Sequence, residues 1–133
     1  MKILVADDES SILLLALLHL QKLGYIEVVP ASDGDEAIAV LSSEIEQQIG
    51  LVITDYDMPR VSGEAVLVES KRLCPTRPVI VMSGDFHSDP TREERLISQG
   101  ADALLEKPFT METFLSIVQA VLNKNPEDTR KPE

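Results

Sequence analysis

Residues 3–8 of the chain read Ile-Leu-Val-Ala-Asp-Asp, a short apolar run that ends in two adjacent acids. Two later apolar runs also end in polar residues: residues 51–54 precede Asp55, and residues 79–82 precede Ser83. If these runs are parallel strands, their carboxyl ends lie along one edge of a sheet, which is where open α/β sheets bind ligands. The pattern therefore predicts a polar site built from the ends of several strands.

The rest of the chain alternates short strand-like runs with longer helical segments, which is typical of a parallel sheet wrapped by helices. We predict an α/β fold with five parallel strands. The predicted strands are residues 2–6, 25–29, 51–54, 78–82 and 102–105. The predicted helices are residues 10–23, 34–48, 63–73, 89–99 and 111–123.

Several of the predicted helix ends have a chemical cause. Gly24 and Gly100 follow the first and fourth helices, and glycine accepts the left-handed conformation that ends many helices. Asp89 before Pro90 favours the start of the fourth helix, with a side-chain cap and then a proline. Thr110 is expected to cap the last helix.

Composition limits the possible partners. A length of 133 residues fits one domain, predicted here as residues 1–123 with a disordered polar tail at residues 124–133. The net charge of −11 argues against binding to nucleic acid, because a phosphate backbone would repel the protein. There is no signal-peptide pattern and no apolar run long enough to span a bilayer, so we expect no membrane association and a cytoplasmic location.

The first predicted helix contains an unusual run, because residues 12–18 are all apolar. Consecutive positions point all round a helix, whereas a helix lying on a sheet buries only one side. Some of these leucines should therefore reach the surface next to the acid pair. Crowding by neighbouring elements would explain the run, but a docking patch for another helix is the slightly favoured interpretation.

The acids at the strand ends suggest a metal. Asp7, Asp8 and Asp55 would repel one another unless a cation lies between them. Oxygen ligands without nearby histidine or thiolate select a hard ion, most plausibly Mg²⁺. With Mg²⁺ bound, a carboxylate can attack phosphorus and form an acyl phosphate. Lys107 would supply positive charge to the phosphoryl oxygens, and the hydroxyl of Ser83 could donate a hydrogen bond to them.

These residues together resemble a known family, the receiver domains of two-component response regulators. The matching segments are residues 3–9, residues 55–59 with Gly63, residues 79–84 and residues 107–109. Each motif is weak alone, but the four occur in the expected order. The resemblance covers residues 2 to 123 and implies a doubly wound, flavodoxin-like sheet with strand order 2-1-3-4-5.

The resemblance also implies a role for each site residue. Asp55 would be the phosphorylated residue, accepting a phosphoryl group from a phosphohistidine on a histidine kinase or a histidine phosphotransfer protein that docks near the first helix. Asp7 and Asp8 would form the acidic pocket, with Mg²⁺ held by Asp8, Asp55 and the backbone carbonyl of Asp57. Ser83 would be the switch hydroxyl and Lys107 the family's lysine. Such a domain catalyses its own phosphorylation with Mg²⁺ and its own slow dephosphorylation, but it is not otherwise an enzyme.

Three residues depart from the family pattern. Leu104 stands where the family usually has a Tyr or Phe whose rotation couples phosphorylation to the output surface. Gly84 replaces a frequent alanine, which makes its loop more mobile. Asp57 adds a carboxylate two residues after Asp55, and we predict that Asp57→Asn changes the lifetime of the phosphorylated form without abolishing phosphorylation.

Two other classes of function remain open from the sequence. A haloacid-dehalogenase-type phosphatase would use Asp55 as nucleophile and Asp57 as general acid, with Ser83 and Lys107 following in the same order. That family, however, carries its metal-binding acid pair after the lysine, and here the pair comes first. The third class is an interaction module that has lost phosphorylation. A stand-alone regulator, a relay intermediate and a receiver from a larger protein all remain possible.

Overall fold

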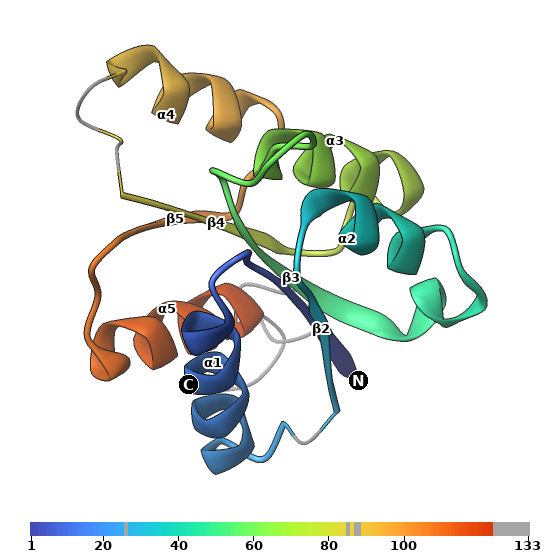
Figure 1. Ribbon diagram of the computed structural model, residues 1–133, viewed down its shortest axis with the longest axis vertical. Coiled ribbons are helices and arrows are strands. Elements are labelled where there is room, and N and C mark those ends of the chain that lie inside the picture. Colours follow the sequence, from blue (N-terminus) through green and yellow to red (C-terminus); the bar gives the residue numbers. More distant parts are fainter. Residues whose placement is uncertain (26, 85, 87–88, 124–133) are drawn as a thin grey trace.

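The computed structural model describes residues 1–25, 27–84, 86 and 89–123. Five parallel strands form one sheet in the order β2-β1-β3-β4-β5, with helices on both faces (Figure 1). The strands are β1 (Lys2–Ala6), β2 (Val28–Ala31), β3 (Ile49–Asp55), β4 (Val79–Ser83) and β5 (Ala103–Glu106). The helices are α1 (Ser10–Lys22), α2 (Gly34–Leu41), α3 (Gly63–Leu73), α4 (Pro90–Ser98) and α5 (Met111–Asn123), with a short 3-10 helix η1 (Glu44–Gln48). The predicted fold class and strand order are confirmed.

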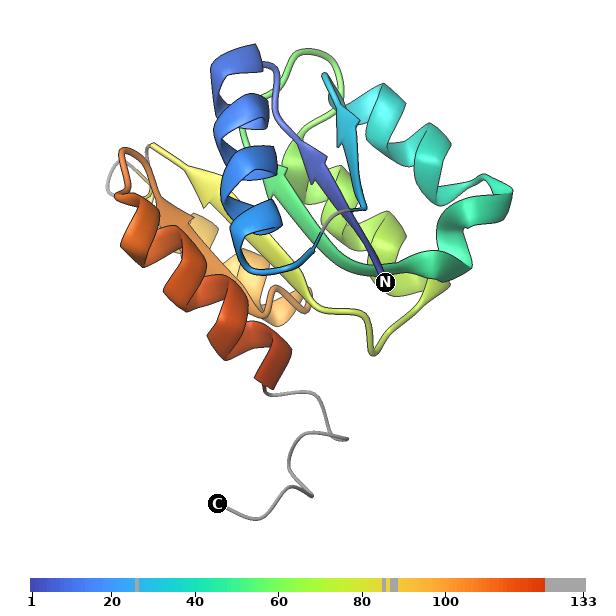
Figure 2. The same cartoon turned by 90° about the horizontal axis from the view of Figure 1, so that it is seen from below.

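The two faces of the sheet are covered by different helices. Helices α1 and α5 lie on one face, and α2, α3 and α4 cover the other (Figures 1 and 2). Alternate residues of a strand point to opposite faces. In β1, Ile3 and Val5 accordingly pack in the cluster that includes Leu20 and Phe114, whereas Leu4 packs in the cluster on the opposite face. The all-apolar strands of the sequence are therefore explained by burial on both sides.

The second helix is shorter than predicted. It ends at Leu41 instead of residue 48, and η1 occupies the remaining residues. The hydroxyl of Ser42 donates to the Ile38 carbonyl at 2.9 Å, and that of Ser43 donates to the Val40 carbonyl at 2.6 Å. The backbone amides of the same two serines donate to these carbonyls as well, so the hydroxyls add second donors at the helix end, where Ser43 turns to an extended conformation.

The second strand begins later than predicted, at Val28 instead of residue 25. Gly24 has φ of +95°, and the Tyr25 amide donates to the Leu20 carbonyl at 3.0 Å. Tyr25 therefore closes the end of α1 and does not belong to the sheet.

The other predicted helix ends can now be compared with the structure. Gly100 has φ of +107° after α4, and the Thr110 hydroxyl accepts from the Thr113 amide at 3.1 Å, so both predictions are confirmed. Pro90 is the first residue of α4, but Asp89 makes no side-chain cap. Its carboxylate accepts from the Thr91 hydroxyl instead, at 2.6 Å. The predicted tail, residues 124–133, lies outside the described residues.

The apolar run of α1 reaches the surface, as predicted. Ala16 and Leu20 are buried against the sheet, whereas Leu14, Leu15 and Leu18 are 56%, 45% and 45% exposed. Within the described part of the chain, no helix is both long and apolar enough to cross a membrane.

Candidate functional site: an acidic pocket at the carboxyl edge of the sheet

The residues predicted from the strand ends meet at one edge of the sheet. Asp7 follows β1, Asp55 ends β3, Ser83 ends β4, and Lys107 follows β5. The pairing of Asp55 with Met82, and of Ser83 with Glu106, aligns these ends. Asp7 and Ser83 are fully buried and Asp55 is 4% exposed. The sheet therefore places two carboxylates and a hydroxyl in a largely dry environment.

Lys107 joins the two buried acids. Its Nζ lies 2.9 Å from Asp7 Oδ2 and 3.4 Å from Asp55 Oδ2. A third carboxylate, that of the exposed Glu9, lies 3.4 Å from the same nitrogen. The other oxygen of Asp7 accepts a hydrogen bond from the Glu9 amide at 2.8 Å. Asp7 is thereby fixed in orientation by one backbone and one side-chain donor.

The acids form a cluster suited to a cation. Oxygens of Asp7, Asp8 and Asp55 all lie within 4.8 Å of one another, and Asp8 is the exposed member at the mouth. Three carboxylates face one nearby ammonium, so negative charge is in excess. An all-oxygen donor set with an open side fits Mg²⁺, which keeps part of its water shell when bound. Asp57 is exposed, and its carboxylate is not part of this cluster.

Burial changes the proton affinity of the site. It raises the pKa of Asp55 to about 7, with the Asp7 charge adding to the effect and Lys107 opposing it. Burial also raises the pKa of Asp7, against the opposing hydrogen bonds from Glu9 and Lys107. For Lys107, burial favours the neutral amine, but the two carboxylates outweigh it and raise its pKa. A cation bound between these carboxylates would favour their ionised forms and oppose this rise in pKa.

The backbone after Asp55 is held on two sides. The Tyr56 amide donates to the Met82 carbonyl at 2.7 Å, and the Gly63 amide donates to the Tyr56 carbonyl at 2.9 Å. A side chain at position 63 would collide with the Asp55 carbonyl. Glycine at the start of α3 therefore allows the helix to approach Asp55 closely.

Two features of the site region were not predicted from the sequence. One is the contact of Glu9 with Lys107. The other is a polar cluster in which Tyr56 meets Arg92 and Arg95 of α4. The spacing of these arginines, three residues apart on a predicted helix, is the sequence signal that could have indicated a shared partner.

The fold and the site together define the class of protein: a doubly wound parallel α/β domain with a carboxylate cluster at the carboxyl edge of its sheet. The family model for the response regulator receiver domain matches residues 3–119. The chain belongs to this family. It is a receiver domain of two-component systems, and members of this family are phosphoacceptor signalling domains that bind Mg²⁺ at an acidic pocket.

Several known regulatory proteins are similar to this chain in sequence or in structure. It is 29% identical over 120 residues to a probable chemotaxis protein CheY of Rhizobium etli, covering 90% of this chain and 91% of that protein. It is 36% identical to the transcriptional regulatory protein KdpE of Mycobacterium tuberculosis, covering 92% of this chain but 51% of that protein. A crystal structure of a response regulator receiver domain protein from Clostridium thermocellum matches with a TM-score of 0.82 and 35% identity, over 92% of this chain and 94% of the other. The chain thus spans nearly all of some relatives, about half of others, and only a small part of others again.

Proposed function

We propose that this receiver domain takes one phosphoryl group from a phosphohistidine of a partner protein onto Asp55, in a reaction that requires Mg²⁺. The observation that carries the proposal is the position of Lys107, whose ammonium contacts both Asp55 and Asp7 beside the open acid cluster. A bound phosphoryl group would lie against one fixed cation. Mg²⁺, held by Asp8, Asp55 and the Asp57 carbonyl with Asp7 nearby, would supply the rest of the positive charge.

The transfer can be written from the residues of the chain. A carboxylate oxygen of Asp55 attacks phosphorus, the phosphorus–nitrogen bond of the donor breaks, and the released imidazole takes a proton. Lys107 neutralises charge on the phosphoryl oxygens, and the Ser83 hydroxyl donates to one of them. Burial of Asp55 limits access of water to the acyl phosphate, which supports a signal that outlasts the encounter with the donor.

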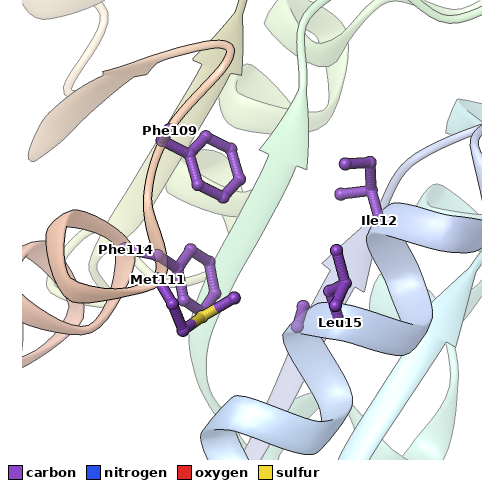
Figure 3. Close-up of a pocket in the computed structure, with 6 residues that line it drawn as sticks. Ile12, Leu15, Phe109, Met111 and Phe114 are labelled. Atoms are coloured by element: carbon purple, nitrogen blue, oxygen red, sulfur yellow. The ribbon is translucent and has the colours of Figure 1, made fainter.

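The surface beside Lys107 supports docking of the donor near α1. Ile12 and Leu15 of α1 face Phe109 and Met111 across an apolar groove (Figure 3), and the same groove reaches Lys107. A partner helix lying on the exposed leucines of α1 would bring its phosphohistidine close to Asp55. A cytoplasmic location remains a prediction from the sequence.

Phosphoramidate, a small phosphoryl donor, tests the chemistry. With Mg²⁺ we expect a single added phosphoryl group by intact mass, absent in Asp55→Asn and retained in Asp57→Asn. Labelling of Asp55→Asn to the same extent as the native protein would refute the proposal. Multiple turnover of p-nitrophenyl phosphate would instead support the phosphatase alternative, which the family match does not favour.

A matched pair of variants tests the docking surface. Leu18→Glu places a charge on α1, and Val68→Glu places one at a similarly exposed position, 46% against 45%, on α3. We expect transfer from a phosphohistidine protein to fall by about tenfold or more in Leu18→Glu alone, because burying a charge in an apolar contact costs more than 1 kcal/mol. Labelling by phosphoramidate should be unchanged in both. Equal rates of protein-to-protein transfer in the two variants would argue against α1.

A further inference from the structure

A cluster of four side chains connects the acidic pocket with α4. We call it the Tyr56 cluster: Tyr56 after β3, Glu64 in the first turn of α3, and Arg92 and Arg95 on α4. Arg95 binds Glu64 with two nitrogens, Nε at 2.9 Å and Nη2 at 3.1 Å. The Tyr56 hydroxyl accepts from Arg95 Nη2 at 3.2 Å and donates to Glu64 at 3.3 Å. The guanidinium carbon of Arg92 lies 4.1 Å from the centre of the Tyr56 ring.

The geometry of this cluster is specific. A two-nitrogen contact between arginine and a carboxylate fixes both side chains in one plane, and a guanidinium over an aromatic face adds a cation–π attraction. Arg95 also holds the pKa of Glu64 below its usual range, so the carboxylate stays charged. Arg95 contacts the hydroxyl of Tyr56 and Arg92 lies over its ring. Tyr56 is therefore the common partner of the two arginines.

Tyr56 is directly bonded to Asp55 in the chain. Its backbone is held between the Met82 carbonyl and the Gly63 amide, so a change in the backbone at Asp55 must move the ring or break one of these bonds. The ring in turn touches α4. No other residue of the Tyr56 cluster is adjacent in sequence to an acid of the pocket.

Helix α4 contacts α3 and Tyr56 through this cluster, in addition to its apolar contact with the core. Leu96 is its buried residue, and Ile97 is 59% exposed. Leu104 on the neighbouring strand β5 is partly buried against the same core, but its side chain is aliphatic and forms neither a hydrogen bond nor a cation–π contact. Among the described residues, the polar contacts given above join Tyr56 and Glu64 on the pocket side of the molecule to α4.

We propose that the Tyr56 cluster transmits the state of Asp55 to α4, in place of an aromatic side chain at position 104. This inference rests on the proposed function, because phosphorylation is the change of state that it transmits. A phosphoryl group adds negative charge one residue from a ring that carries two arginines. The phosphorylated and free forms therefore interact differently with α4, which is the condition for shifting its equilibrium position.

Hydrogen exchange of the full chain tests the inference, with beryllofluoride and Mg²⁺ as a mimic of the acyl phosphate. In the native protein we expect exchange of the α4 amides to change by about fivefold when beryllofluoride binds. Fluorine NMR reports its binding independently. In Glu64→Gln and in Tyr56→Phe, binding should persist while the α4 response falls below about twofold, since each loses part of the cluster.

Glu69→Gln is the matched control, because Glu69 is also an α3 glutamate paired with an arginine, but its partner, Arg72, lies on α3 itself. It should keep the native response. A full α4 response in Glu64→Gln and Tyr56→Phe, equal to that of Glu69→Gln, would overturn the inference. Bound beryllofluoride without any α4 response in the native protein would overturn it as well, and would leave the proposed function intact. Absence of bound beryllofluoride in the native protein would contradict both.

Discussion

The two ends of the sheet bury charge in opposite ways. At the amino end of β4, Arg77 is 3% exposed, and its guanidinium has both an ion-pair partner and hydrogen-bond acceptors. It pairs with the Glu46 carboxylate at 2.8 Å and donates to the Ser70 hydroxyl at 3.0 Å. Its Nη1 and Nη2 also donate to the backbone carbonyls of Glu46 and Ser70. One cation therefore meets one carboxylate and several neutral acceptors.

At the carboxyl end the charges do not balance. Asp7 and Asp55 are buried beside one ammonium, that of Lys107, and Asp8 adds a third carboxylate at the mouth. Burial consequently raises the pKa of Asp55 to about 7. Charge is thus balanced where it holds the fold together, and it is left unbalanced where we propose that a cation and a phosphoryl group bind.

The largest effect on stability is expected at the balanced end. Arg77→Met leaves the Glu46 carboxylate and the Ser70 groups without their cation, and we expect a loss of about 3–5 kcal/mol in the free energy of unfolding. Urea denaturation at neutral pH measures it. The matched control is Arg72→Met, whose pair with Glu69 lies at the surface and is worth about 0–1 kcal/mol. Equal losses in the two variants would contradict the structural role of Arg77.

A smaller effect, of opposite sign, is expected at the unbalanced end. Folding raises the pKa of Asp55 from 3.8 to about 7, so the folded state binds a proton more tightly than the unfolded state. The ionisation of Asp55 therefore reduces stability progressively between about pH 4 and pH 7. Without metal at pH 8, Asp55→Asn should be more stable than the native protein by about 1–3 kcal/mol.

The pH dependence provides the check on this second prediction. The stability difference between Asp55→Asn and the native protein should shrink as the pH falls from about 7 to about 4, because Asp55 is protonated in the folded state below about pH 7 and becomes protonated in the unfolded state only near pH 3.8. The exposed Asp57→Asn should stay within about 0.5 kcal/mol of the native protein throughout. A loss of stability in Asp55→Asn at pH 8 would contradict this prediction, because it would mean that neighbouring groups already stabilise the buried negative charge of Asp55.

Mg²⁺ should restore part of the stability that the acids remove. At about ten times its dissociation constant, a ligand of the folded state adds about 1.4 kcal/mol. Because protons compete for Asp55, the apparent affinity for Mg²⁺ should fall as the pH is lowered through about 7. Thermal denaturation at increasing Mg²⁺ concentrations, at pH 6 and at pH 8, measures both the added stability and the apparent affinity. The same affinity at both pH values would argue that Asp55 is not a ligand.

The smallest effect is expected at Asp57, which lies outside the buried cluster. Asp57→Asn removes an exposed charge two residues after Asp55, which we expect to change the barrier to hydrolysis by under about 1 kcal/mol and hence its rate by about two- to fivefold. The variant should become phosphorylated and then lose the label at a different rate. Intact mass followed over time after removal of the donor measures the decay. An unchanged decay would show that Asp57 does not influence hydrolysis.

Much of the pocket could be predicted from the sequence, because its residues follow apolar runs directly. Asp7, Asp55 and Ser83 are fixed in space by the strands that they end, so parallel pairing alone brings them together. Lys107 is placed at the same edge because it directly follows β5, which pairs with β4. Helix α3 was predicted with the observed bounds, since its glycine start and amphipathic pattern agree.

What could not be predicted depends on contacts between distant segments. Arg77 pairs with Glu46 across 31 residues, and Arg95 pairs with Glu64 across the same separation. Neither pairing leaves a local pattern. The second helix ends where the backbone of Ser43 becomes extended, with the hydroxyls of Ser42 and Ser43 bonded to its last turn. A hydrophobic pattern at helical spacing does not reveal such a change of backbone conformation. The predicted site residues follow from local sequence, whereas the Arg77–Glu46 ion pair and the Tyr56 cluster depend on tertiary contacts.

The most direct test of the central claim is the location of the phosphoryl group and its dependence on metal. The protein is incubated with phosphoramidate, with Mg²⁺ or with EDTA, and the acyl phosphate is trapped by borohydride reduction before peptide mass spectrometry. We predict modification of Asp55 with Mg²⁺ and none with EDTA. Modification of Asp7, Asp8 or Asp57 instead, or equal labelling of Asp55 without metal, would contradict the account of the carboxyl edge as a metal-dependent phosphoryl acceptor.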